Sequence, residues 1–313
     1  MEYANLRTAY GKTLAELGGT NDQIVLVEAD LCKSTMGVFF EEAFPERFFE
    51  MGIAEADMAS VAAGLSLTGK IPFIASFAAF APGRCYDQIR TSICIPGLNV
   101  KICGSSAGLS DFGDGSTHQS IDDIALMRVL PGMHVFSPVD AVQTAQIVKY
   151  MAANTGPMYI RINRNDLPVL TSEEQGFEPG KIYTMREGSD VAIFATGIMV
   201  SIALKAAEDL AVKGIDAMVL NVPSIKPLDP DTVLNICSKA GAIITAEEHS
   251  IYGGLGDAIS AITAPKLAIR HIRVGILDKF GTSAPNYQVL LEYYGLTPES
   301  IVKASLEVLG KQC

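Results

Sequence analysis

The feature that most constrains this fold is a regular alternation of short apolar runs with segments of helical periodicity. The apolar runs are rich in Val, Ile and Phe and are continuous, which predicts parallel strands covered on both faces. The segments between them predict the helical crossovers that parallel strands require. We therefore predict an α/β protein with two parallel-sheet domains. The predicted strands are Ile24–Glu28, Pro72–Phe77, Asn99–Gly104, Met133–Ser137, Met158–Ile162, Val191–Thr196, Ala217–Val222, Ala242–Glu247 and Ile272–Ile276.

A polar stretch, Asp166–Gly188, contains several Pro and Gly residues and predicts an inter-domain linker. We predict a first domain over residues 1–170, a linker over residues 171–188 and a second domain over residues 189–313. The predicted helices are Leu6–Leu17, Glu55–Leu67, Ser120–Leu130, Ala141–Ala153, Met199–Lys213 and Gly256–Thr263.

Composition narrows the class of protein. With 313 residues, 49% hydrophobic and 19% charged, the chain is long and apolar enough for two buried cores. Its net charge of −11 disfavours a nucleic-acid partner. The N-terminal segment lacks a signal-peptide pattern and no apolar stretch suits a membrane span, so we expect a cytoplasmic protein with no membrane association. The cysteines lack CxxC spacing and are expected to be free thiols: Cys32, Cys85, Cys94, Cys103, Cys237 and Cys313.

Gly52-Ile53-Ala54-Glu55 places a carboxylate at the start of an Ala-rich helix, directly after a short strand-like run. Burial at such a position raises the pKa of a carboxyl group and makes Glu55 a candidate for handling protons. The alternative is that Glu55 only complements the helix dipole at the first turn. The pattern alone leaves both interpretations open.

Ligands of open parallel sheets bind beyond the carboxyl ends of the strands. That rule brings together four loops: Ala29–Ser34, Phe77–Arg84, Ser105–Ser120 and Asn163–Asn165.

Two of these loops carry candidate chemical groups. Phe77 and Phe80 are separated only by alanines, so they form either a slot for a flat heterocycle or ordinary core. The Gly-rich segment after Ser105 carries Asp114 and His118, which suit acid–base chemistry, although a capping turn explains the same pattern.

Three arginines, Arg7, Arg161 and Arg164, complete the set of candidates. Arg164 stands just past a strand end, where a guanidinium can bind a phosphate or carboxylate through two parallel hydrogen bonds. Arg7 opens the first helix, where the sequence alone favours a structural ion pair.

The order of these motifs resembles the C-terminal half of transketolase from Arg7 to beyond Gly256. The motifs that carry the resemblance are Ala29-Asp30-Leu31, Gly52-Ile53-Ala54-Glu55, Phe77-Ala78-Ala79-Phe80, Asp87-Gln88-Ile89-Arg90 and Gly113-Asp114-Gly115-Ser116-Thr117-His118-Gln119. The resemblance implies a pyrimidine-binding domain followed by the family's C-terminal domain.

For the cofactor, the resemblance implies that Glu55 hydrogen-bonds the pyrimidine ring of thiamine diphosphate and favours its imino tautomer. It implies that Phe77 and Phe80 pack around that ring and that Asp30 contacts the cofactor.

For the substrate, it implies that Asp114 recognises a donor hydroxyl and that His118 transfers protons near the reacting carbonyl. It implies that Arg7, Ser34 and Arg164 hold the phosphate of a phosphorylated sugar. Many transketolases have a phosphate-binding histidine where this chain has Ser106, and the loop Ala81–Gly83 also departs from familiar enzymes.

The resemblance also predicts a partner. Gly113-Asp114-Gly115 resembles the start of the family's Mg²⁺ motif, but no Asn follows between Ser116 and Ala153, so we predict no metal site in this chain. A separate diphosphate-binding subunit is then expected to hold the divalent ion and share the cofactor, in a heterotetramer such as α2β2. The second domain is expected to serve subunit contacts.

The predicted function is therefore that of the C-terminal subunit of a split transketolase. Such an enzyme transfers a two-carbon ketol unit from a ketose phosphate to an aldose, as in the pentose phosphate reactions. Two alternatives remain: the corresponding half of 1-deoxyxylulose-5-phosphate synthase or of a 2-oxo acid dehydrogenase (its beta subunit), and a non-catalytic assembly subunit.

Overall fold

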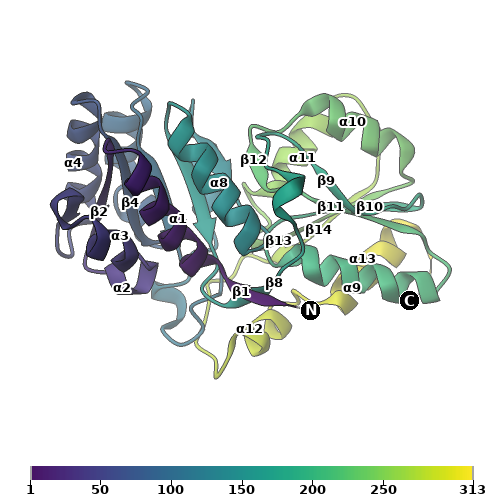
Figure 1. Ribbon diagram of the computed structural model, residues 1–313. Helices are drawn as coiled ribbons and strands as arrows, with labels where there is room; N and C mark the ends of the chain where they lie inside the picture. The colour runs from purple at the N-terminus through teal and green to yellow at the C-terminus, as the bar shows by residue number, and fades with distance from the viewer. Residues whose placement is uncertain (1, 312–313) are drawn as a thin grey trace.

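The computed structural model describes residues 2–311, which form two α/β lobes joined side by side (Figure 1). The first lobe is built on a seven-stranded sheet with strand order β12-β6-β7-β5-β4-β2-β3. Its strands pair in parallel, except that β12 lies antiparallel to β6. The strands are β2 Ile24–Glu28, β3 Phe48–Glu50, β4 Ile71–Phe77, β5 Lys101–Ser105, β6 His134–Phe136, β7 Met158–Ile162 and β12 Ser224–Lys226.

Alternate residues of each strand enter opposite cores, as the period of two requires. In β2, Leu26 packs with helices α1 (Leu6–Thr20) and α8 (Ala141–Ala153), whereas Val27 packs with α4 (Glu55–Leu67) and α7 (Asp123–Arg128) on the other face. The sheet is therefore buried on both faces, which explains its continuous apolar runs. Shorter helical segments complete this lobe: α2 Cys32–Thr35, α3 Val38–Ala43, α5 Ala81–Arg84, α6 Tyr86–Gln88 and the turns Pro45–Arg47, Ile89–Cys94 and Gly115–Thr117.

The second lobe has a five-stranded sheet with strand order β14-β13-β10-β11-β9. Its strands are parallel except β9, which lies antiparallel to β11. Helices α9 and α13 pack against one face, and α10 and α11 against the other. The elements are β9 Tyr183–Arg186, β10 Val191–Ala195, β11 Ala217–Asn221, β13 Ile243–Ser250, β14 His271–Ile276, α9 Met199–Val212, α10 Pro230–Lys239, α11 Leu255–Thr263, α12 Tyr287–Tyr293 and α13 Pro298–Val308.

Two features of the path of the chain were not part of the linker prediction. The stretch predicted as linker contains β8 (Asp166–Pro168), which pairs antiparallel with β1 (Tyr3–Asn5), a short turn at Glu173–Gln175, and β9. In addition, β12 follows the second lobe's strand β11 in the chain but joins the sheet of the first lobe. The chain therefore crosses between the lobes more than once.

Predicted element bounds agree with the structure for some elements and differ for others. The bounds of β2, β7, α4 and α8 agree with the predicted segments. The helix predicted over Ser120–Leu130 is shorter, because Gly108 N donates to Ser120 O at 2.8 Å and draws the start of that segment into the preceding loop.

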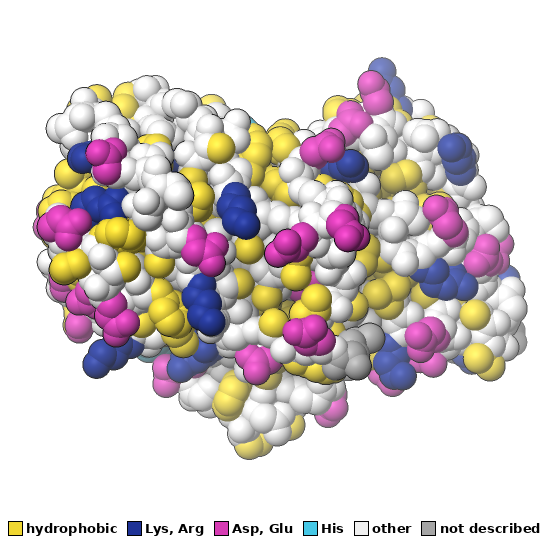
Figure 2. All heavy atoms as spheres, viewed as in Figure 1, with side chains coloured by type: hydrophobic (Ala, Val, Ile, Leu, Met, Phe, Trp, Pro, Cys, Tyr) yellow, Lys and Arg dark blue, Asp and Glu magenta, His cyan; other side chains and the backbone are white. Residues whose placement is uncertain are grey.

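Other predictions bear on the environment of the chain. Among residues 2–311, no helix has the length and apolar character that a bilayer crossing requires. The five cysteines in this range are free, and Cys313 lies outside the described residues. Figure 2 shows acidic and basic side chains interspersed over the face in view.

Candidate functional site

Four of the predicted loops follow neighbouring strands of the larger sheet. The strands β7, β5, β4 and β2 are adjacent and parallel, so their carboxyl ends lie along one edge. The loops after them carry Asp30, Ser34, Phe80, Asp114, His118 and Arg164, and Phe77 ends β4. The helix α4 begins at the same edge, whereas Arg7 lies in α1 and Arg161 within β7. This topology explains why residues far apart in the sequence reach one site.

Glu55 is the first residue of α4 and is only 4% exposed. Its Oε1 accepts a hydrogen bond from Nη1 of Arg84 at 2.7 Å, in an ion pair whose arginine side chain is half exposed. The carboxylate is thus buried, as predicted, and it also has a specific partner. A role limited to the helix dipole does not require that partner.

Phe77 and Phe80 form a stacked pair, with ring centroids 5.9 Å apart and planes inclined by 19°. The imidazole of His118 meets both rings edge-on, at 6.1 Å from Phe77 and 5.2 Å from Phe80. The guanidinium of Arg84 lies 4.0 Å from the centroid of Phe80 while it binds Glu55. Flat groups therefore stack beside a carboxylate here, which is the arrangement that a planar nitrogen heterocycle would use.

The Gly-rich loop brings His118 to the aromatic pair, and Nδ1 of His118 lies 2.9 Å from Oγ1 of Thr117. With Nδ1 engaged in this contact, Nε2 remains available for proton transfer. Asp114 lies in the same loop and is exposed. Its carboxylate is therefore accessible to a polar ligand that enters from solvent.

The candidate anion-binding residues are joined through Asn5. Asn5 caps α1 by accepting from Arg7 N at 3.1 Å, and its Nδ2 donates to Arg164 O at 3.1 Å. Arg7 Nη1 donates to the carbonyl oxygen of Ser34 at 2.9 Å, so Ser34 is positioned beside Arg7. Arg164 forms an ion pair with Asp111, a residue that the sequence analysis did not single out.

Asp30 and Gly52 are held by a second unpredicted residue. Asp30 adopts a positive φ of 60°, and its N–H donates to Glu50 Oε1 at 2.7 Å. Gly52 N donates to the same oxygen at 2.8 Å. Glu50 thereby fixes the loop after β2 against the segment that leads into Glu55.

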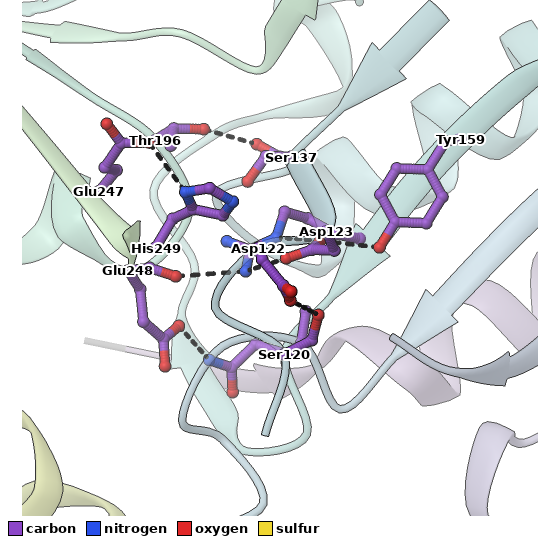
Figure 3. A network of polar contacts seen from close by, with 12 residues as sticks. Ser120, Asp122, Asp123, Ser137, Tyr159, Thr196, Glu247, Glu248 and His249 are labelled. Carbon is purple, nitrogen blue, oxygen red and sulfur yellow. Dashed lines mark hydrogen bonds and ion pairs between the residues drawn. The ribbon is translucent and has the colours of Figure 1, made fainter. Parts of the chain in front are cut away.

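Arg161 lies away from the anion-binding residues, in a buried network between the lobes. Its Nε donates to Asp123 Oδ2 at 2.8 Å, and its Nη2 donates to Glu248 O at 3.2 Å. Tyr159 donates its hydroxyl to the same Asp123 oxygen at 2.7 Å. Figure 3 shows this network, in which the first lobe meets the β13 residues Glu247, Glu248 and His249. Arg161 is therefore committed to the lobe boundary, and Arg7 and Arg164 remain as the candidate anion ligands.

Burial sets the protonation preference of Glu248. The side chain is 4% exposed, and this desolvation raises the pKa of Glu248 to about 7, although the positive charge of Arg161 opposes the shift. Its Oε1 accepts from Leu109 N at 2.8 Å, so Glu248 anchors the start of the loop that carries Asp111.

Sequence reasoning assigned no role at the site to Arg84, Asp111, Glu50 or Glu248. Arg84 closes the Ala81–Gly83 loop, whose departure from the family pattern was a usable signal. The other three contact residues that are distant in the sequence, and a single sequence does not encode such pairings visibly. Within residues 2–311, no group of three or more His, Cys, Asp or Glu side chains is placed to hold a metal ion.

Comparison with known proteins matches both lobes. The model described as "Transketolase, pyrimidine binding domain" matches residues 2–169, and that described as "Transketolase, C-terminal domain" matches residues 180–301. A 6-deoxy-6-sulfo-D-fructose transketolase subunit of Clostridium sp. is 44% identical, over 98% of this chain and 95% of the relative. An apulose-4-phosphate transketolase subunit of Phocaeicola vulgatus is 37% identical, over 97% of both chains.

Solved structures give the same picture of the fold. A structure titled as a split gene transketolase, an inactive beta4 tetramer, is 48% identical with a TM-score of 0.90 over 99% of both chains. A transketolase from Pichia stipitis is 21% identical, with a TM-score of 0.84 over 47% of its own chain. At that identity the second comparison supports the fold alone.

Proposed function

This chain belongs to the transketolase family, and from that premise we propose that it is the pyrimidine-binding subunit of a split transketolase. In this proposal it transfers a two-carbon ketol unit from a ketose phosphate to an aldose, in the cytoplasm. The observation that carries the proposal is the buried Glu55 carboxylate beside the stacked rings of Phe77 and Phe80. The relatives named as transketolase subunits are named for different sugars, so the donor is the least constrained part of the proposal.

The residues at the site fit the pyrimidine end of thiamine diphosphate. Phe77 and Phe80 offer flat apolar surface, and Glu55 offers a desolvated acceptor at its edge. When bound, thiamine diphosphate supplies the electron sink for cleaving the bond next to the ketose carbonyl. Glu55 holds a proton at a ring nitrogen, and the aromatic pair orients the ring and excludes water. Asp30, in the loop after β2, contributes a further cofactor contact.

Other residues act on the sugar. His118 holds or moves a proton at the substrate carbonyl oxygen, and Asp114 orients a hydroxyl group of the donor. Arg7 and Arg164 bind the anionic tail of the sugar, which is the charged group at the end remote from its carbonyl. Ser34 holds Arg7 in place. These assignments divide the site into a heterocycle end and an anion end.

The chain supplies only part of a cofactor site in this proposal. The diphosphate and its divalent ion are held by a partner subunit, and the two kinds of chain assemble as α2β2. The relatives named as subunits and the structure titled as a beta4 tetramer support both a partner and self-association. The isolated chain is accordingly expected to be inactive and to bind the cofactor weakly.

The test is ketol transfer by the complex reconstituted with its partner, comparing the wild type with Glu55→Gln. Loss of one proton-transfer group typically lowers a rate by about 100-fold or more, and we expect at least that loss. Glu46→Gln is the matched control, because Glu46 lies on an exposed turn before β3. Near-normal turnover by Glu55→Gln would remove Glu55 from the mechanism.

The same complex separates the alternatives. Efficient use of pyruvate as the donor, with no reaction of ketose phosphates, would assign the chain to a synthase or 2-oxo acid dehydrogenase instead. If substitutions at Glu55, Asp114 and His118 all leave turnover unchanged, the chain is an assembly subunit.

A further inference from the structure

The anion end of the site contains a buried negative charge. Asp111 lies in the loop after β5 and is 3% exposed, and its Oδ2 forms an ion pair with Nη1 of Arg164. The guanidinium of Arg164 also lies 5.9 Å from the ring centroid of Phe77, so the ion pair adjoins the stacked rings of Phe77 and Phe80. One of the two candidate anion ligands is therefore already partly neutralised by the protein itself.

Arg7 belongs to the same group of charges. Asn5 joins the two arginines by accepting from Arg7 N and donating to Arg164 O, each at 3.1 Å. Burial lowers the pKa of Arg7, Arg164 lowers it further, and the negative charge of Asp111 opposes both effects. The two guanidinium groups and the Asp111 carboxylate therefore interact as one cluster.

The net charge of this cluster determines whether a singly or a doubly charged substrate tail suits it better. Two arginines and the buried Asp111 leave a single net positive charge, to which the exposed Asp166 adds a negative charge that solvent screens. A phosphate monoester carries about −1.5 to −2 at pH 7, because its second pKa is about 6. A sulfonate carries one negative charge at every pH at which proteins are stable. A dianion has to approach Asp111 with a second uncompensated charge, and solvent screens this repulsion less at the buried Asp111 than at an exposed carboxylate.

We propose that Asp111 determines which anionic tail the site accepts, favouring a monoanionic tail over a dianionic phosphate. The preferred substrate class is therefore a ketose with a sulfonate, or with a singly protonated phosphate, at the end remote from its carbonyl. This inference rests on the proposed function, since it assumes that Arg7 and Arg164 bind the tail of a ketol donor. It adds a selectivity residue that the resemblance did not assign.

The experiment compares two donors in the reconstituted complex: a ketohexose 6-phosphate and its 6-deoxy-6-sulfo counterpart. At pH 8 we expect the wild type to have the higher kcat/KM with the sulfonate. Asp111→Asn removes the charge and keeps the shape, and we expect the sulfonate-to-phosphate ratio of kcat/KM to fall at least tenfold. A change of less than about twofold would overturn the proposal.

Asp166→Asn is the matched control. Asp166 also acts on Arg7, but it is exposed at the start of β8 and solvent screens its charge. Its Oδ1 accepts from Nδ2 of Asn5 at 2.8 Å, and asparagine at this position keeps a side-chain oxygen for that hydrogen bond. We expect this variant to change the ratio by less than about twofold. An effect as large as that of Asp111→Asn would show that any nearby charge alters selectivity and would overturn the specific role of Asp111.

A second test uses the wild type alone and so does not depend on the variant folding. Lowering the pH from 8 to 5.5 protonates the phosphate but leaves the sulfonate unchanged. The ratio of kcat/KM should therefore move towards the phosphate donor, because pH effects on the protein that do not depend on the charge of the tail act on both donors and cancel in the ratio. A ratio independent of pH would contradict the proposal. If the complex used neither donor, the proposed function itself would fail, which is a different outcome.

Discussion

Among single residues, Arg84 makes the most informative contact in the site. Its guanidinium lies over Phe80 and donates to Glu55, the two surfaces proposed for the pyrimidine ring. In the proposed function, a pyrimidine ring at these surfaces replaces the ion pair. Arg84 is half exposed, so the pair contributes no more than about 1 kcal/mol.

We accordingly expect Arg84→Ala to lower the Kd of the assembled complex for thiamine diphosphate by about two- to fivefold, the equivalent of up to about 1 kcal/mol. Calorimetric titration measures this without requiring turnover. Arg90→Ala is the control, since Arg90 is exposed and lies in the next turn of the chain. Weaker cofactor binding by Arg84→Ala would mean that Arg84 supports the ring instead of being displaced by it.

Asp123 offers a second prediction at this scale, one concerned with stability. Its carboxylate binds both Arg161 and Tyr159 where solvent is excluded. Asp123→Ala leaves the Arg161 charge buried without its partner, and we expect the free energy of unfolding to fall by about 3–5 kcal/mol. Asp216→Ala breaks the exposed pair with Arg186 and should cost less than about 1 kcal/mol. Urea denaturation of both variants measures the two losses in free energy of unfolding. Equal losses would contradict the prediction.

At the scale of elements, the loop between β5 and α7 depends on a glycine. Gly108 has a φ of +67°, and a Cβ added there would lie 2.6 Å from Oε1 of Glu248. Gly97 has a similar φ of +66° but has nothing within 4 Å of an added Cβ. Both Gly→Ala changes incur the cost of positive φ, about 1–2 kcal/mol, but only Gly108→Ala also disturbs the contact between the lobes.

We therefore expect Gly108→Ala to lower the thermal midpoint clearly more than Gly97→Ala. It should also reduce turnover, because the same loop carries Asp111 and His118. Scanning calorimetry and the ketol-transfer assay measure the two effects. Equal losses of stability in the two variants would show that the contact with Glu248 is not a constraint.

The elements also show what the sequence could predict. The strand β2 could be predicted because full burial imposes a continuous apolar pattern, and the helix α4 because its residues are mostly small or apolar and suit a helix. The pairings β1–β8 and β6–β12 did not, since three-residue strands leave no periodic signal. The residues of the site also fall into those that the sequence could predict and those that it could not. Glu55, Phe77 and His118 stand in local motifs, whereas Arg84 and Asp111 acquire their roles only through contacts that folding creates.

For the whole molecule, the boundary between the lobes depends on pH. Burial raises the pKa of Glu248 to about 7, above its value in an unfolded chain. The positive charge of Arg161 opposes this shift, and the negative charge of Asp123 adds to it. Folding therefore favours the protonated carboxyl group. Its contribution to stability is complete below about pH 4.5 and is lost as the pH rises towards 7.

Glu248→Gln keeps an acceptor for Leu109 N but does not titrate. As the pH rises from 5 to 7, we expect the wild type to lose stability relative to this variant, by up to about 1.4 kcal/mol per pH unit. Burial lowers the pKa of His271 to about 4, so His271 makes the free energy of unfolding rise with pH. This contribution is the same in both proteins and cancels in the difference between them. Urea unfolding at both pH values provides the measurement. A constant difference would contradict the shift.

At the scale of the whole molecule, two large apolar side chains beside the site are exposed to solvent. Ile53 precedes Glu55 by two residues and is 76% exposed. Phe280 is 83% exposed and adjoins Gly281, which packs against Gln119 of the Gly-rich loop. If a partner subunit completes the cofactor site, it must approach the molecule on the side where Ile53 and Phe280 lie. Burying such a side chain contributes about 1.5–3 kcal/mol.

We therefore expect Ile53→Ser and Phe280→Ser each to weaken binding of the partner subunit by at least about tenfold, as measured by sedimentation or calorimetric titration. Val212→Ser is the control, because Val212 is 90% exposed near the end of α9 in the second lobe. It tests whether loss of any exposed apolar side chain has the same effect. Partner affinity that is unchanged in the first two variants, or equally reduced in all three, would place the partner on a different face of the molecule.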